Sequence, residues 1–313
     1  MGRVWIGTSG WNYPHWRGRF YPPGLRQKDE LSYLAGRLGS VEVNGTFYSL
    51  SRPEACAAWR QAVPAGFPFA IKGSRYITHM LKLNRFAAPL GNFFAQGILR
   101  LGAQLGPILW QLPPGLAFSA ERARPFFEAL PRDLAAAERC ARRHDQRTTG
   151  RAALRAPDGR DRRLRHALEP RHPSWLEDQA LALLAEHDIA LVAADTAGKH
   201  PFSLARTASF AYLRLHGSTA LYASRYTDDE LALWASRVAE LRAGGRDVYV
   251  YFDNDAQAHA PHDALRLQER VAAAVEAQGP PNRRRLARPR ARLAAFAHND
   301  HSQARDFFQA RRK

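Results

Sequence analysis

Eight short segments rich in apolar and β-branched residues recur along the chain, and most are separated by enough sequence for a helix. Such alternation predicts parallel strands joined by right-handed crossovers, which restricts the fold to an α/β class. The segments are Val4–Thr8, Val41–Phe47, Phe67–Lys72, Pro107–Leu112, Leu164–Glu169, Ile189–Thr196, Phe210–His216 and Asp247–Asp253.

The connecting segments carry helix signals of unequal strength. Residues 227–230 read Thr-Asp-Asp-Glu, a capping box that predicts a helix running to Gly244. Residues 174–177 predict the same device before the sixth strand. The longest link, between the fourth and fifth strands, predicts an exposed helical extension and a loop. Residues 197–209 are too few, and too broken by glycine and proline, for a full helix.

Eight strands over a length near 280 residues predict one closed (β/α)₈ barrel of the TIM type, with an irregular connection between strands 6 and 7. We assign residues 1–279 to this barrel and residues 280–313 to an Arg-rich C-terminal extension that we expect to be mobile. An open doubly wound sheet is the alternative. The turn Gly7–Trp11 matches neither a dinucleotide-binding fingerprint nor a phosphate-binding P-loop, which disfavours it.

Several classes of protein are disfavoured. No apolar run reaches the roughly 18 residues of a membrane helix. The N-terminus leads almost directly into a strand, which leaves no room for a signal peptide. Cys56 and Cys140 lie too far apart to suggest a disulfide framework. We therefore expect a cytoplasmic protein with no membrane partner; the oligomeric state stays open.

The formal charge of +17 is unevenly distributed. Residues 139–171 carry +7 and residues 281–313 carry +8, so the rest of the chain is close to neutral. Charge runs are usually solvated surface, but a basic stretch and a basic tail can also contact a polyanion. Nucleic-acid binding through these two segments is therefore the alternative function.

Polar side chains follow all eight predicted strands. In a parallel barrel the C-terminal ends of the strands meet at one face, where active sites are found. Candidates for proton transfer are Glu42, Glu169, Asp195 and His216. Candidates for substrate binding are Ser9, Trp11, Asn44, Lys72, His79, Gln111, Arg171, Arg214, Tyr226 and Asn254.

A series of short motifs runs along the chain in a characteristic order. The motifs are Gly7–Trp11 with Tyr13 and Trp16, residues 18–22, Glu42–Asn44 with Thr46–Tyr48, Lys72 with Thr78–His79, Trp110–Pro114, Glu169 with Arg171–His172, Asp195–Thr196, Arg214–Gly217, Tyr226 and Tyr251–Asp255. In this order they resemble the YecE-like family, domain of unknown function 72. The resemblance covers about residues 4–275 and implies a TIM-type barrel without implying an activity.

The residue types at the predicted mouth favour an enzyme acting on a small anionic substrate, phosphorylated or sugar-like. Lys72, Arg171 and Arg214 would hold the anion, and the carboxylates or His216 would move protons. Hydrolysis, isomerisation and lyase chemistry all fit. We expect no cofactor; a divalent metal such as Mg²⁺ or Mn²⁺ on the carboxylates and His216 is an alternative that the nearby cations oppose. A non-catalytic scaffold would leave the polar mouth unexplained.

Overall fold

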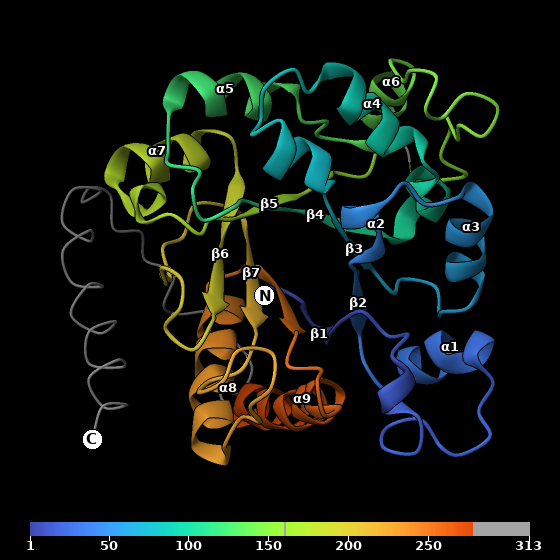
Figure 1. The fold of residues 1–313 in the computed structure, drawn as a ribbon. Coiled ribbons are helices and arrows are strands. Elements are labelled where there is room, and N and C mark those ends of the chain that lie inside the picture. The colour runs from blue at the N-terminus through green and yellow to red at the C-terminus, as the bar shows by residue number, and fades with distance from the viewer. Residues whose placement is uncertain (160, 278–313) are drawn as a thin grey trace.

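A computed structural model describes residues 1–159 and 161–277, in which eight parallel strands close into a barrel (Figure 1). Each strand pairs with the next in sequence order, and the eighth pairs with the first. The predicted extension over residues 280–313 lies outside the described residues. The strands are β1 (Val4–Ser9), β2 (Ser40–Val43), β3 (Phe69–Lys72), β4 (Leu105–Gln111), β5 (His166–Glu169), β6 (Ile189–Asp195), β7 (Phe210–Leu215) and β8 (Asp247–Phe252).

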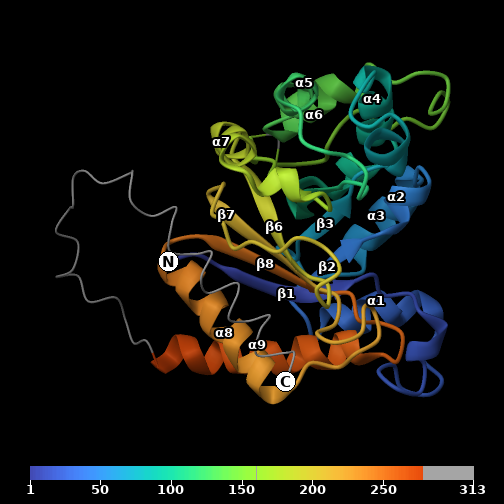
Figure 2. The same ribbon diagram turned by 60° about the vertical axis from the view of Figure 1, so that its left-hand side comes forward.

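Helices surround the barrel. The long helices α8 and α9 pack together on one side, and α4, α5 and α6 lie on the other (Figure 2). The α-helices are α1 (Glu30–Ala35), α2 (Gly45–Tyr48), α3 (Pro53–Gln61), α4 (Ala87–Ala95), α5 (Ala120–Ala129), α6 (Leu134–Ala141), α7 (Asp178–Glu186), α8 (Asp228–Ala243) and α9 (His259–Ala277). Shorter turns are 3₁₀ at Pro14–Trp16, Gln27–Asp29, Ile98–Gln104 and Pro173–Leu176, and π-helical at Tyr76–Met80.

The predicted (β/α)₈ barrel is confirmed. Along each strand, successive side chains alternate between an apolar layer inside the barrel and an apolar layer outside it. Residues that face the barrel axis form a small inner cluster, and their neighbours pack outward against the helices. On β6, for example, Val192 belongs to the inner cluster and Leu191 to the outer one. Trp5 stacks on Tyr249 in the inner layer with ring centroids 4.6 Å apart. The inner cluster thus packs below the polar mouth.

Two local predictions are wrong. The second strand ends at Val43, because Asn44 takes helical backbone angles and the chain turns into α2. Thr46, expected in the strand, instead donates its hydroxyl to the Lys72 carbonyl at 2.7 Å. Ser174 forms no capping box before α7; its Oγ accepts from the backbone N–H of Phe118 at 2.8 Å. Both hydroxyls contact another element in addition to a near neighbour in sequence: Thr46 Oγ1 also lies 3.2 Å from the Val43 carbonyl, and Ser174 Oγ lies 2.8 Å from His172 Nδ1.

Other connections agree with the sequence. Thr227 and Glu230 form the capping box of α8, and Gly244 follows its last residue. The link from β4 to β5 contains α5, α6 and an irregular stretch. In the described chain no helix lies between β6 and β7. Cys56 and Cys140 are both buried and free.

Candidate functional site at the barrel mouth

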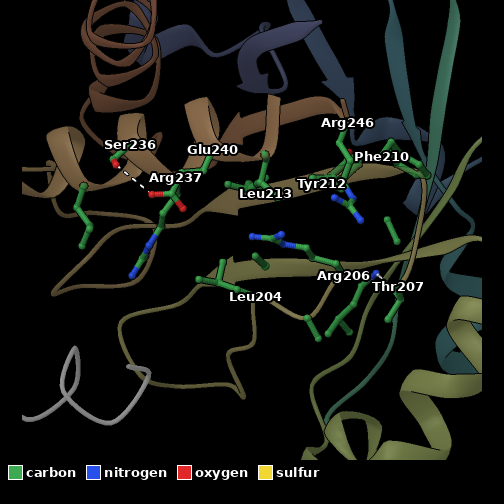
Figure 3. Close-up of a pocket in the computed structure, with 17 residues that line it drawn as sticks. Leu204, Arg206, Thr207, Phe210, Tyr212, Leu213, Ser236, Arg237, Glu240 and Arg246 are labelled. Carbon is green, nitrogen blue, oxygen red and sulfur yellow. Dashed lines mark hydrogen bonds between the residues drawn. The ribbon is translucent and has the colours of Figure 1, made fainter. Parts of the chain in front are cut away.

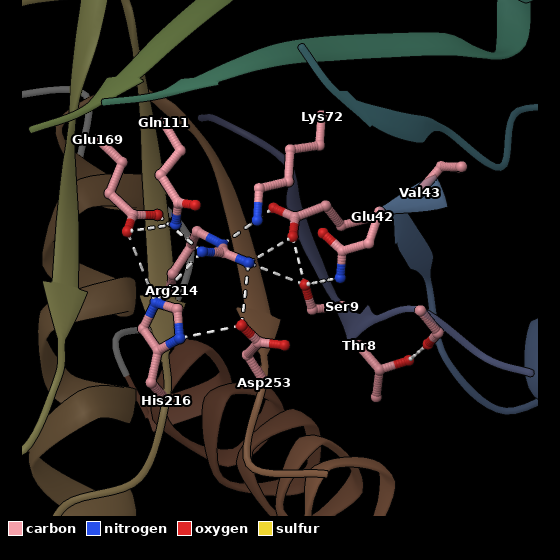
Figure 4. A network of polar contacts seen from close by, with 12 residues as sticks. Thr8, Ser9, Glu42, Val43, Lys72, Gln111, Glu169, Arg214, His216 and Asp253 are labelled. Atoms are coloured by element: carbon pink, nitrogen blue, oxygen red, sulfur yellow. Dashed lines mark hydrogen bonds and ion pairs between the residues drawn. The ribbon is translucent and has the colours of Figure 1, made fainter. Parts of the chain in front are cut away.

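The guanidinium of Arg214, near the end of β7, lies at the centre of a buried polar network (Figure 4). Its nitrogens contact carboxylates from three other parts of the barrel. Nη2 lies 2.7 Å from Oε1 of Glu42, Nη1 lies 2.7 Å from Oε2 of Glu169, and Nη2 lies 3.1 Å from Oδ2 of Asp253. Arg214 is completely buried, so its charge is neutralised inside the protein and is not available to a ligand.

Further hydrogen bonds hold the Glu42 side of this network in place. Ser9 Oγ accepts from Arg214 Nη2 at 2.9 Å and from Asn44 Nδ2 at 2.8 Å, and it donates to the Glu42 carboxylate. Tyr212, on β7 below Arg214, donates its hydroxyl to Glu42 Oε2 at 2.6 Å. Glu42 is therefore saturated with donors, as a buried carboxylate must be to keep its charge.

Opposite charges at close range set the protonation states. Burial alone would raise the pKa of Glu169, but Arg214 and the neighbouring cations hold it well below its usual range. Burial would likewise raise the pKa of Asp253, and Arg214 and His216 keep it lowered. Burial works against the charge of Arg214, yet the surrounding carboxylates raise its pKa. These groups stay ionised at neutral pH and form a fixed network of ion pairs.

His216 extends the network toward β8. Its Nδ1 lies 2.9 Å from Asp253 Oδ2, and Arg214 Nη1 lies 3.2 Å from its Nε2. The ring has no exposed surface, and the Tyr222 ring packs edge-on against it at 5.5 Å between centroids. His216 is therefore placed to orient Asp253 and Arg214, behind Tyr222.

Lys72, at the end of β3, is the cation of the mouth that lacks a partner. It is only 7% exposed, and among the described residues its ammonium forms neither a hydrogen bond nor an ion pair. Nζ lies 4.6 Å from the ring centroid of Phe47, and the His79 ring packs on the same phenyl at 5.1 Å. Burial and then the nearby Arg214 lower the pKa of Lys72.

Arg171, just after β5, is the second accessible cation. Its Nη2 donates to Glu169 Oε1 at 3.0 Å, and Gln111 Nε2 donates to the same oxygen at 2.9 Å. Nη1 lies 2.9 Å from Nε2 of His200. Burial, then the charge of Arg171, lowers the pKa of His200 to about 4. Burial, then the charge of Lys72, lowers the pKa of His79 to about 4. Both imidazoles are neutral at pH 7.

Three predicted site residues lie outside this network, on the outer side of the strands. Asp195 follows Ala194, whose side chain faces the barrel axis, so the Asp195 side chain points outward, where Tyr226 donates to it at 3.2 Å. Asn254 Nδ2 donates to Asp263 Oδ2 of α9 at 2.9 Å. Asn254 thus joins the segment after β8 to α9, and the predicted roles of Asp195, Tyr226 and Asn254 stay predictions.

Trp11 lies at the edge of the mouth. Its ring packs edge-on against Trp59 at 5.5 Å between centroids, and its carbonyl accepts from the Tyr21 hydroxyl at 2.6 Å. The indole is partly exposed, so one part of it packs on the scaffold and another faces solvent. Its predicted contact with a substrate stays a prediction.

The structure adds four residues that sequence reasoning did not place in the site: Asp253, Tyr212, His200 and Tyr222. Period-two alternation from Tyr249 and Tyr251 would have selected Asp253 instead of Asn254, and alternation back from Arg214 would have selected Tyr212. His200 and Tyr222 lie in irregular loops, where no periodicity carries a signal.

The predicted metal alternative meets a geometric obstacle. The oxygens of Glu42 and Glu169 that would bind the ion already accept from Arg214. Within residues 1–159 and 161–277, no group of three or more His, Cys, Asp or Glu side chains is arranged to hold a metal ion.

The helices of that same part of the chain include none long and apolar enough to cross a membrane.

Comparison with known proteins agrees with this architecture. The UPF0759 protein YecE of Escherichia coli strain K12 is 25% identical over 144 residues, which cover 40% of this chain and 50% of the relative. The match to the protein of the same name from strain O157:H7 has the same extent. The chain thus matches about half the length of these curated relatives.

Solved structures show the same fold. A DUF72 family protein from Thermotoga maritima superposes with a TM-score of 0.67 at 24% identity, covering 86% of this chain and 99% of that one. A DUF72 family protein from Enterococcus faecalis gives 0.63 at 18% identity, covering 86% and 95%. The family described as protein of unknown function DUF72 matches residues 5–287. This chain therefore belongs to the DUF72 family.

Proposed function

We propose that this protein is an enzyme that binds a small anionic substrate, phosphorylated or sugar-like, at the C-terminal mouth of the barrel. Lys72 and Arg171 hold the anion, and His79 is our candidate for proton transfer. Glu42, Glu169 and His216 hold the buried network of ion pairs that surrounds Lys72, Arg171 and His79. The reaction class that fits is acid–base chemistry, whether hydrolysis, isomerisation or elimination.

The observation that carries this proposal is the unpartnered ammonium of Lys72. Burying a charge without a partner is expensive, and natural proteins seldom do so without a reason. Three carboxylates lie in the same mouth, yet each is already occupied by Arg214. A bound anion would supply the missing partner.

Arg171 and the two neutral histidines support the same reading. A guanidinium binds phosphate or carboxylate through paired hydrogen bonds, and Arg171 is partly exposed. His79 shares the Phe47 ring with Lys72, so an anion on Lys72 lies beside a neutral imidazole. The negative charge of the ligand would raise the pKa of His79 toward the working pH, where an imidazole exchanges protons best.

Calorimetric titration with ribose 5-phosphate, inorganic phosphate and uncharged ribose tests the proposal. We expect the two phosphates to bind and K72M to weaken binding by about tenfold or more, since charged hydrogen bonds contribute roughly 1.5–3 kcal/mol. K28M removes the same charge from an exposed helix-start position and should have no effect. Phosphate affinity unchanged in both K72M and R171M, or no phosphate binding by the wild type, would refute the anion site.

Nucleic-acid binding is a second candidate, favoured by a group of exposed arginines. On α6 and the loop after it, Arg139, Arg142, Arg143, Arg147, Arg151 and Arg155 are all exposed. Such a surface would bind a phosphate backbone with an affinity that falls steeply with salt. Binding of labelled DNA or RNA that persists in an R142A/R143A/R147A variant would exclude this surface as the binding site.

A further inference from the structure

A cavity of about 270 Å³ lies on the outer side of the barrel, between α8 and the loop that connects β6 to β7 (Figure 3). The described part of that connection contains no helix, so the outer faces of β6 and β7 are covered there by a loop alone. Leu191 and Ala193 of β6 and Ala211 and Leu213 of β7 line the cavity. The two alanines leave space that larger side chains would fill.

Hydrogen bonds hold the loop in place over this cavity. Thr207 Oγ1 donates to the Ile189 carbonyl at 2.7 Å and accepts from the Leu191 backbone N–H at 2.8 Å. Arg246 Nε donates to the Ala208 carbonyl. The loop is thus tied to the first residues of β6 and to the segment before β8, so the cavity is formed by fixed walls.

Positive charge dominates the polar part of the lining. The side chains of Arg206 and Arg246 both extend into the space between loop and helix (Figure 3). Arg206 forms no hydrogen bond or ion pair with another described residue, and Arg246 uses Nε alone, on a carbonyl. The carboxylate of the lining is Glu240, whose Oε1 accepts from Ser236. Two guanidinium groups are therefore available to an anion.

The size of the cavity selects the occupant. The volume of about 270 Å³ lies just below the range for small-molecule pockets, about 300–1,000 Å³, so the cavity suits a ligand of modest size. The exposed side chains of Arg206, Leu233 and Ser236 mark the side that opens to solvent. A small molecule can enter there.

We propose that this cavity binds a small amphiphilic anion, an apolar chain that ends in a carboxylate or a phosphate. The headgroup lies between Arg206 and Arg246, and the chain packs on the outward aliphatic side chains of β6 and β7. Such a ligand takes the place of the side chains that a helix between β6 and β7 would otherwise contribute. This site is distinct from the barrel mouth: the ligand chain packs on the outward side chains of Leu191, Ala193 and Leu213, although Tyr212, whose hydroxyl contacts Glu42 in the mouth, also contributes to the lining.

Calorimetry with decanoate, decyl phosphate and uncharged decanol tests this on the full chain. We expect both anions to bind, decanol to bind at least about tenfold more weakly, and R206A to weaken the anions by a similar factor. A193L should reduce the affinity for all three ligands, because it fills the space for the chain. Comparison of decanoate with decyl phosphate identifies the preferred headgroup.

Two controls separate this site from the mouth and from misfolding. K72M removes the mouth ammonium and should leave decanoate affinity unchanged. R206A changes an exposed loop side chain and should keep the wild-type melting temperature. Decanoate affinity that is unchanged in both R206A and A193L, or absent in the wild type, would overturn the proposal. Decanoate binding lost in K72M and kept in R206A would place the ligand in the mouth instead.

Discussion

Replacing Arg214 by methionine should destabilise the protein more than any exposed ion-pair substitution, because it leaves buried carboxylates without their common partner. Methionine keeps much of the volume, so the effect is electrostatic. Removing one member of a buried pair typically destabilises by about 3–5 kcal/mol. Arg214 serves Glu42, Glu169 and Asp253 at once, which places R214M at the upper part of that range. For a domain of this size the melting temperature should fall by roughly 6–20 °C.

The unfolding free energy that the protein loses in R214M should also depend on pH. The pKa values of Glu169 and Asp253 lie below their unfolded values in the folded protein. Their contribution to stability is therefore complete above about pH 4, where the unfolded carboxyls ionise, and is lost as pH falls through the folded pKa. In R214M this contribution is gone. The difference in unfolding free energy between the wild type and R214M should be largest at pH 7 and should shrink below about pH 4.

Urea unfolding of both proteins at pH 7, at pH 4 and at about pH 3, below the pKa of the unfolded carboxyls, measures this difference. R60M is the matched control, since Arg60 pairs with Asp158 at the surface and such pairs contribute about 0–1 kcal/mol. A loss for R214M no larger than that for R60M, or a difference that does not change with pH, would refute the assignment of Arg214 as the electrostatic centre.

Three further predictions follow from individual contacts. T227A removes the capping box of α8 and should lower the unfolding free energy by about 0.5–2 kcal/mol, and an unchanged urea midpoint would contradict the cap. The imidazole of His79 should titrate with a pKa of about 4 by NMR, and that pKa should rise when phosphate is added; a titration above pH 6 in the free protein would contradict its burial beside Lys72. Y212F should leave Glu42 with one donor fewer and destabilise by about 1–3 kcal/mol, measured by urea unfolding, whereas Y48F at an exposed tyrosine should change nothing.

The closed barrel could be predicted because the same apolar strand pattern occurs eight times along the sequence. Each strand carries an apolar segment and most connections are long enough for a helical crossover, so the short connection between β6 and β7 does not change the predicted number of strands. The ends of individual strands were harder to predict than the number of strands. Strand 2 was placed through Phe47, because β-branched and aromatic residues continue past Val43 while the backbone turns at Asn44.

The candidate site was only partly predictable. Alternation along β2 and β7 placed Glu42 and Arg214 on inward positions, and the structure brings them together. At the ends of β6 and β8 the inward positions are Ala194 and Asp253, so Asp195 and Asn254, which the sequence predicts for the site, lie on the outer side of the strands. His200 and Tyr222 come from loops whose paths depend on tertiary contacts that no local pattern encodes.

The position of Arg214 late in the chain has a consequence for biosynthesis. A nascent chain that ends before Phe210 contains Glu42 of β2 and Glu169 of β5 without Arg214, the guanidinium that joins them, and Arg171 contacts Glu169 alone. Like charges held in an apolar environment repel strongly, so such a half-made sheet would not close around them. The barrel can therefore close around this network only after β7 and β8 have been synthesised.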